Sequence, residues 1–166
     1  WIAPILCFTA EEAWQIRHQD WNKSVHFEIW PDLPDTWADE SLVGRWENIR
    51  KARLVVTGAI EKMRAAGEVK SSLQAHPHLY APQAVIDAFA GLDAADIFIT
   101  SAATLVAGDA PQGAFTIDDD TTLAAVVGLA EGGKCQRCWK VLPEVDETED
   151  ALCGRCESVV SSMDAA

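Results

Sequence analysis

The longest helical pattern in the chain is "ESLVGRWENIRKARLVVTGAIEKMRAAG", residues 40–67. Side chains that suit one face recur in it at spacings of three and four residues, which is the repeat of an α-helix. The repeating positions are Leu42, Trp46, Ile49, Arg53, Val56, Ile60 and Met63. Gly67 is the expected end, because glycine readily adopts the left-handed conformation that closes helices. The stretch therefore predicts one long helix, with Arg53 close to its buried seam.

The residues before this helix predict a shorter helix and an irregular connection. Residues 9–18 are good helix formers, and Thr9 with Glu12 three residues later has the pattern of a capping box. Cys7 lies on the apolar side and is expected to be an inert, buried thiol. Residues 21–39 are rich in tryptophan and proline, which favours an extended connection. Because the chain opens on an apolar run without Met, we expect it to be a piece of a longer protein.

The residues after the long helix predict a mixture of strands and one helix. Residues 71–81 alternate in the manner of a strand, and Pro77 indicates a place near a sheet edge. The other predicted elements are a helix at 83–92 and strands at 97–101 and 123–130. The segments 106–115 and 117–121 resemble loops, and we interpret the charge run Asp118, Asp119 and Asp120 as the tip of a turn.

These patterns together predict an α+β fold. It consists of a helical bundle segment, then a small α/β part, then a four-cysteine hairpin module. The predicted domains are residues 1–70, the end of a helical domain, residues 71–133, a small α/β junction domain, and residues 134–166, a cysteine-rich tail.

Four of the five cysteines lie in "KCQRCWKVLPEVDETEDALCGRC", residues 134–156. They form two C-x-x-C pairs, Cys135/Cys138 and Cys153/Cys156, with 14 residues between the pairs. Two such turns supply the tetrahedron of sulfurs that Zn²⁺ prefers, and four thiolates leave no open position for catalysis. The pattern therefore predicts one structural Zn²⁺ and no catalytic residue. Two disulfides, or a redox dithiol, remain as alternatives.

Trp139 directly follows the first cysteine pair. One interpretation is a ring packed against the metal site as a miniature core. The other is a stacking platform for an unpaired base, with cations beside it for phosphates. The cations of this segment each lie within two positions of a cysteine; they are Lys134, Arg137, Lys140 and Arg155.

The charge of the chain is unevenly distributed. The formal net charge of −13 argues against binding a polyanion. However, residues 45–70 carry seven Lys and Arg against three acids, whereas residues 71–133 carry none against eight acids. The basic side chains of 45–70 either pair with helix neighbours such as Glu47 and Glu61 or form a face for phosphates. Local basic zones therefore keep nucleic-acid binding open.

Several of these stretches resemble one family. "KCQRCWK…CGRC" is similar to the C-terminal zinc-binding segment of bacterial isoleucyl-tRNA synthetases. "APILCFTAEEAW" and "SVHFEIWPDLP" resemble a helix and connection in the anticodon-binding domain of that family. "WENIRKARLVVTGAIEKMRAAGEVKSSLQA" resembles the long helix and next strand that related class I synthetases share. The similarity spans essentially the whole chain, and the C-x-x-C-W tail is what indicates isoleucine.

The resemblance implies that residues 1–70 end an anticodon-binding domain and that the tail recognises tRNA. The implied partner is isoleucine tRNA, contacted by Trp139 and the four cations of the tail. The family joins isoleucine to its tRNA with ATP and Mg²⁺, but the ATP-site signatures HIGH and KMSKS are absent from this chain. The chain is therefore expected to be non-catalytic by itself. We expect a cytoplasmic, monomeric parent enzyme with no membrane association.

Two other functions fit the cysteine pattern. A DNA-repair glycosylase carries a similar four-cysteine hairpin that enters DNA, although the acidic composition argues against duplex binding. A zinc-stapled protein-interaction domain would use Trp139 as its central contact. Binding to tRNA, to duplex DNA, or to neither distinguishes the three.

Overall fold

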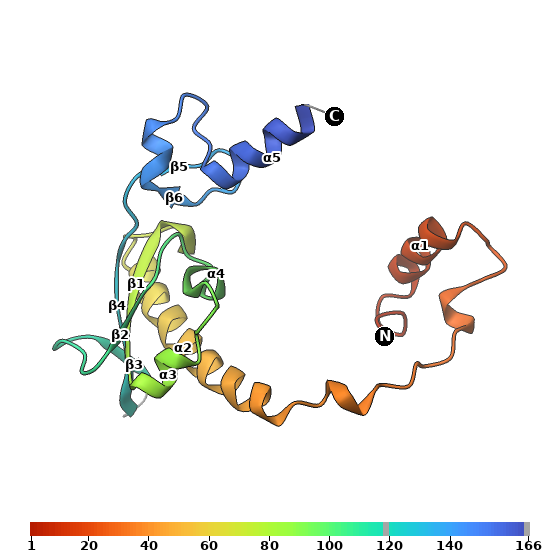
Figure 1. The fold of residues 1–166 in the computed structure, drawn as a ribbon, viewed down its shortest axis with the longest axis horizontal. Coiled ribbons are helices and arrows are strands. Elements are labelled where there is room, and N and C mark those ends of the chain that lie inside the picture. Colours follow the sequence, from red (N-terminus) through yellow and green to blue (C-terminus); the bar gives the residue numbers. More distant parts are fainter. Residues whose placement is uncertain (118–119, 165–166) are drawn as a thin grey trace. The chain divides into compact units, whose positions relative to one another are not determined.

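The computed structural model describes residues 1–117 and 120–164, which divide into two units. The N-terminal unit is Trp1–Asp39, and the main unit is Glu40–Ala166. Figure 1 shows the elements of each. The domain boundaries at residues 70 and 133 stay a prediction. Asp118 and Asp119, interpreted as a turn, lie outside the described residues. Among the residues that are described, no helix is both long and apolar enough to cross a membrane.

The N-terminal unit contains α1 (Cys7–His18) and two short 3-10 helices, η1 (Val25–Phe27) and η2 (Asp35–Trp37). The carboxylate of Glu11 joins α1 to the chain entering η1. It accepts hydrogen bonds from Gln15 Nε2 at 2.7 Å, from Ser24 Oγ at 2.8 Å and from the Val25 N–H at 3.0 Å. These donors, the Gln15 amide first, lower the pKa of Glu11.

Two expectations for this unit are wrong. The residue before α1 is Leu6, which makes no side-chain cap, so Thr9 lies inside the helix and forms no capping box. Cys7 is exposed and not buried. The physical reason is that the unit has almost no core of its own. Its only buried apolar residues are Ala3 and Ala10, while the side chain of Phe8 is 92% exposed.

The main unit packs helix α2 (Glu40–Ala65) against a four-stranded sheet in the order β2-β1-β4-β3. The strands are β1 (Ala75–Ala81), β2 (Thr104–Ala107), β3 (Phe115–Ile117) and β4 (Asp120–Leu129). β1 pairs with β2 in parallel, and the other two pairs are antiparallel. The short helices α3 (Gln83–Asp87) and α4 (Ala94–Phe98) lie in the connection from β1 to β2 and contact α2. The predicted α+β class is therefore confirmed.

The core lies between α2 and the sheet. Ile49, Val56 and Ile60 of α2 are 0–2% exposed and belong to one cluster with Leu79 of β1 and Phe98 of α4. Fully burying an aliphatic side chain of this size contributes about 1.5–3 kcal/mol. The predicted long helix is thus observed almost at its predicted bounds. Its seam differs at two positions, because Leu42 and Arg53 are exposed, and Ala52 is buried beside Arg53.

The α/β part departs from the sequence prediction in four places. Pro77 does not mark an edge, since β1 is central. However, the ladder with β2 begins only at His78, one residue past the proline. The predicted strand 97–101 is instead the end of α4, closed by Ile99 in the left-handed conformation.

The third difference concerns β2 and β3, which fall mostly in segments predicted as loops. Both are short, at four and three residues, so their patterns carry little periodicity. The predicted helix 83–92 is likewise reduced to the five residues of α3.

We predict opposite effects for two glycine substitutions within α2. A Cβ at Gly58 would lie 2.6 Å from Cε1 and 2.7 Å from Cζ of Phe115, whereas a Cβ at Gly44 would meet nothing within 4 Å. Gly44→Ala should raise the free energy of unfolding by about 0.5–1 kcal/mol, because alanine favours helix. Gly58→Ala should lower it by about 1–3 kcal/mol through overpacking. Urea unfolding measures both, and equal stabilisation by the two would contradict the packing of β3 on α2.

Candidate metal centre

The first cysteine pair lies in the turn of a small hairpin. Strand β5 (Gly133–Lys134) pairs with β6 (Val141–Leu142), and the turn between them contains Cys135 and Cys138. The turn is closed by hydrogen bonds from the Cys135 N–H to the Lys140 carbonyl and from the Trp139 N–H to the Cys135 carbonyl. The hairpin therefore forms the first C-x-x-C turn itself, whereas the sequence suggested a hairpin that links the two pairs.

Gly132, just before β5, is required by its surroundings. Its φ is +105°, and a Cβ there would lie 2.3 Å from the carbonyl group of Leu142. Only glycine allows the two strands to approach this closely while the backbone adopts that conformation.

The second cysteine pair lies at the start of helix α5 (Gly154–Asp164). Cys153 precedes the helix, and its carbonyl accepts from the Glu157 N–H at 2.9 Å, while Cys156 is in the first turn. The unpaired N–H groups of a helix start favour negative charge, which suits thiolates. Gly154 therefore begins a helix and is not part of a separate tight turn. We call residues 133–164 the metal module.

The four sulfurs converge on one point. Their Sγ atoms all lie within 4.8 Å of one another, and Cys138 Sγ is 3.7 Å from Cys153 Sγ. A tetrahedral ion with bonds of about 2.3 Å has sulfurs about 3.8 Å apart. All four cysteines are free thiols, and the two turns are joined by the Cys153 N–H, which donates to Cys135 Sγ at 3.4 Å. These residues can therefore hold one tetrahedral metal ion.

The thiols of Cys135, Cys138 and Cys153 differ in how readily they ionise. Burial opposes ionisation of Cys135, but N–H groups of Cys138, Cys153 and Arg137 donate to its sulfur and lower its pKa to about 6. Burial raises the pKa of Cys138 to about 12 and raises the pKa of Cys153. A cation is thus needed to hold all four as thiolates, and its binding releases protons.

The module has little apolar core apart from the cysteines. The buried members of its cluster are Cys135, Cys153, Cys156 and a single aliphatic side chain, Val145. The 3-10 helix η4 (Pro143–Glu147) carries Val145 beneath the hairpin, and the acids Glu144, Asp146, Glu149 and Asp150 are exposed in and after it. Bonds from a metal ion to these four sulfurs would therefore take the place of apolar burial.

Trp139 does not pack into this cluster. Its side chain is 60% exposed, and the nearest cation, Lys134 Nζ, lies 5.6 Å from the ring centroid. The backbone of Trp139 has φ +66°, a left-handed conformation that costs a non-glycine residue about 1–2 kcal/mol. The first C-x-x-C turn thus requires a left-handed residue after Cys138, and here that strained position presents an indole to solvent.

The four cations of the tail occupy different environments. Lys134, Arg137 and Arg155 are exposed, and Arg137 Nη1 lies 3.9 Å from Cys156 Sγ. Lys140 is 23% exposed, and its Nζ lies 2.6 Å from Asp96 Oδ1 of α4. Three of the four predicted cations are therefore free to meet a ligand, and Lys140 is in an ion pair.

Sequence reasoning missed two residues that contact the module, Asp96 and Ser101. Ser101 is 5% exposed, donates to the Leu73 carbonyl and accepts from the Val141 N–H of β6. Ser101 lies in the segment 97–101 predicted as a strand, Asp96 directly precedes it, and nothing in their spacing relates them to the cysteines. Only the chain path through α4 brings them to the hairpin.

The basic face of residues 45–70 is partly used within the fold. Arg45 donates to the carbonyls of Ala88 and Ala90 after α3, and Arg64 pairs with Glu61 at 2.6 Å. Three further cations, Arg50, Lys51 and Arg53, are exposed, and no ion pair joins them to other described residues. The predicted pairing of this face with acids is thus confirmed only for Glu61.

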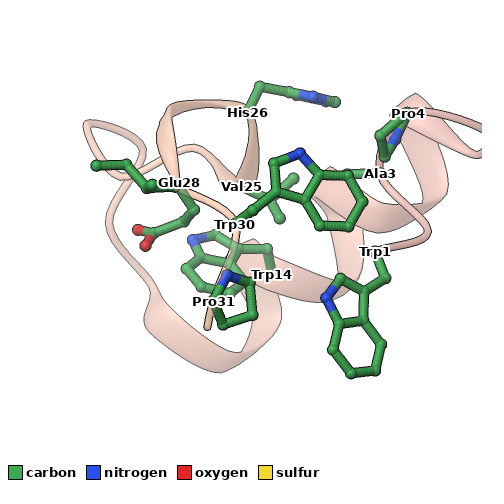
Figure 2. A pocket seen from close by; sticks show the side chains of 10 residues that line it. Trp1, Ala3, Pro4, Trp14, Val25, His26, Glu28, Trp30 and Pro31 are labelled. Atoms are coloured by element: carbon green, nitrogen blue, oxygen red, sulfur yellow. The ribbon is translucent and has the colours of Figure 1, made fainter. Parts of the chain in front are cut away.

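The N-terminal unit contains a separate pocket of about 540 Å³. Figure 2 shows the indole rings of Trp1, Trp14 and Trp30 around it, together with His26 and Glu28. The Nε1 atom of Trp14 is buried without a hydrogen-bond partner in the described chain. Three of the ten residues that line the pocket are thus tryptophans.

Comparisons with known proteins agree with this geometry. Residues 1–79 match the family of the anticodon-binding domain of tRNA ligase. The chain is 42% identical to the isoleucine–tRNA ligase of Caulobacter vibrioides over 87% of its length, and 42% identical to that of Gluconobacter oxydans over 98%. The chain spans about 15% of the length of the curated relatives that it matches.

Residues 1–79 therefore match the anticodon-binding domain of tRNA ligases, and the chain is similar over most of its length to part of that class of enzyme. Within that class, the relatives it resembles are bacterial isoleucine–tRNA ligases, and the similarity continues through the cysteine segment. The resemblance read from the sequence is thus confirmed.

We predict that Cys153→Ser abolishes metal binding and unfolds the metal module while α2 and the sheet stay folded. Metal binding to such sites contributes about 10–16 kcal/mol in small zinc peptides, and the module has little else to stabilise it. Metal analysis and amide hydrogen exchange measure the two effects. Cys7→Ser is the matched control, because Cys7 is exposed and lies outside the module. Cooperative loss of the sheet in Cys153→Ser would contradict the prediction.

Proposed function

We propose that this chain is a non-catalytic, tRNA-recognising region of an isoleucine–tRNA ligase, and that its tail contacts isoleucine tRNA. The observation that carries the proposal is the exposed ring of Trp139, held by the first C-x-x-C turn with Lys134 Nζ 5.6 Å from the ring centroid. An indole in this setting can stack on an unpaired base, which is how proteins commonly read single-stranded RNA.

The metal of this site is Zn²⁺ in the proposal. Four thiolates are a soft, tetrahedral ligand set, which suits zinc and leaves no open position for a substrate. The ion supplies stability and shape, and it takes no part in chemistry. ATP, Mg²⁺ and isoleucine are handled by parts of the enzyme outside this chain, which acts in the cytoplasm.

We assign the contacts to RNA to those side chains of the tail that are exposed to solvent. Trp139 stacks on a base, while Arg137, Lys134 and Arg155 meet phosphates. Arg137 has a second task, since its guanidinium lies beside the Cys156 sulfur and offsets the negative charge of the thiolates. The acidic side chains after β6 lie apart in sequence from these cations, which allows an acidic chain to keep a local positive surface.

Two substitutions of Trp139 separate binding from folding. Trp139→Gly and Trp139→Ala should both raise the KM for tRNA of the full-length enzyme, because stacking is worth about 1–3 kcal/mol per base. Trp139→Gly should be the more stable of the two by about 1 kcal/mol, since only glycine relieves the strain at φ +66°. Thermal unfolding and aminoacylation measure these effects, with isoleucine-dependent ATP–pyrophosphate exchange as the internal control. An unchanged KM for tRNA with metal still bound would refute the stacking role.

Arg137→Ala should flatten the salt dependence of tRNA binding. Loss of one phosphate contact reduces the slope of log K against log salt by about 0.7–0.9. Arg64→Ala is the matched control, because Arg64 is exposed but already paired with Glu61. Binding is measured by fluorescence anisotropy between low and moderate salt, with duplex DNA as a second ligand. Equal slopes in wild type and Arg137→Ala, at unchanged metal content, would contradict the phosphate contact.

A further inference from the structure

The hairpin of the metal module is attached to the α/β part at two neighbouring residues. The N–H of Val141 donates to Ser101 Oγ at 2.6 Å, and the same hydroxyl donates to the Leu73 carbonyl at 2.5 Å. One residue earlier, Lys140 Nζ lies 2.6 Å from Asp96 Oδ1. Both attachment points directly follow Trp139 in the chain.

The Ser101 contact is the buried part of this attachment. Ser101 is 5% exposed and joins three segments of chain, namely the residues before β1, the end of α4 and strand β6. Removing the hydroxyl leaves the Leu73 carbonyl and the Val141 N–H each without this partner. Unsatisfied buried backbone groups are costly, so the contact constrains where β6 lies.

The Lys140 contact is the charged part. The side chain of Lys140 is more covered than its partner, at 23% against 56% exposed. The hydrogen bond and charge of Lys140, with a smaller contribution from Arg155, lower the pKa of Asp96. The ion pair between Lys140 and Asp96 therefore links the module to α4.

We infer that Asp96, Ser101 and Lys140 are positioning residues that fix the orientation of the metal module, and with it Trp139, relative to the sheet. Lys140 acts through Asp96 and is not one of the phosphate contacts. The inference rests on the proposed function. It assigns Lys140 to orienting the metal module and not to contacting tRNA. Fixing the module before tRNA arrives removes an ordering cost from binding, as preorganised surfaces do.

A charge exchange between Asp96 and Lys140 tests this assignment in the full-length protein. Asp96→Lys and Lys140→Asp should each raise the KM for tRNA by roughly fivefold, the upper end for a partly exposed pair, without altering ATP–pyrophosphate exchange. The double variant should return the KM close to that of the wild type, because the pair is restored in reverse. A phosphate contact at Lys140 gives the opposite result, since the double variant still lacks that cation. Failure of the double variant to recover would overturn the inference.

Asp109→Lys is the matched control for this experiment. Asp109 is exposed in the same acidic part of the chain, and its replacement changes the net charge by the same amount as Asp96→Lys. It should leave the KM for tRNA unchanged. A rise as large as that in Asp96→Lys would assign the effect to overall charge and overturn the inference.

Hydrogen exchange tests the Ser101 contact without tRNA. In Ser101→Ala the Val141 amide should exchange faster, while metal content and the amides of α2 stay as in the wild type. Slow exchange at Val141 in this variant would overturn the docking role of Ser101. Trp139→Gly separates the two proposals, because a normal KM for tRNA in that variant refutes the proposed function and leaves the exchange result at Val141 unaffected.

Discussion

Burial of one face of α2 against strands β1 and β4 is the contact on which the rest of the main unit depends. Ile49, Val56 and Ile60 supply the helix side, and Leu79 supplies the centre of the sheet. Because β1 is paired on both sides, the same burial places β2 and, through the connection before it, α4. The carboxylate of Asp96 and the hydroxyl of Ser101 are therefore presented to the hairpin by a core that neither residue belongs to.

The metal module solves a different physical problem. Its 32 residues, 133–164, contain a cluster in which cysteines outnumber aliphatic side chains among the buried members. Small domains of this kind need a metal or another staple, because they cannot bury enough apolar surface to offset the entropy of ordering the chain. The same cysteine turn places Trp139 in a left-handed conformation with its ring exposed. In the proposed function, the stability of the module and its surface for tRNA thus depend on the same cysteine turn.

Charge is also distributed unevenly between the main part of the chain and the metal module. The chain carries a formal net charge of −13, yet the cations of the tail gather around the cysteines. Close to a four-thiolate centre these cations offset negative charge, and the exposed ones remain available to a polyanion. The contacts of each cation differ. Lys140 forms an ion pair with Asp96, whereas Arg137 lies near the Cys156 sulfur. The net charge of a chain therefore does not reveal whether part of its surface is locally positive.

The amino-acid sequence by itself determined the elements that depend on local spacing. The three- and four-residue repeat predicted α2, and the two C-x-x-C pairs predicted the four-sulfur site, because helix faces and knuckle turns are set by neighbours a few residues apart. It also carried the family resemblance. The capping box at Thr9, the strand at 97–101 and the burial of Cys7 were wrong, since each depended on packing partners and not on the pattern alone.

Only the tertiary structure decided which residues contact the metal module. Asp96 lies 44 positions from Lys140 and Ser101 lies 40 from Val141, so no local pattern connects them. Likewise, Arg137 and Lys140 have the same charge and similar spacing from a cysteine, but only Lys140 pairs with Asp96 of α4, and it is the less exposed of the two. Contacts between residues so far apart in sequence depend on how the whole chain folds around its core. Local sequence patterns therefore do not predict them.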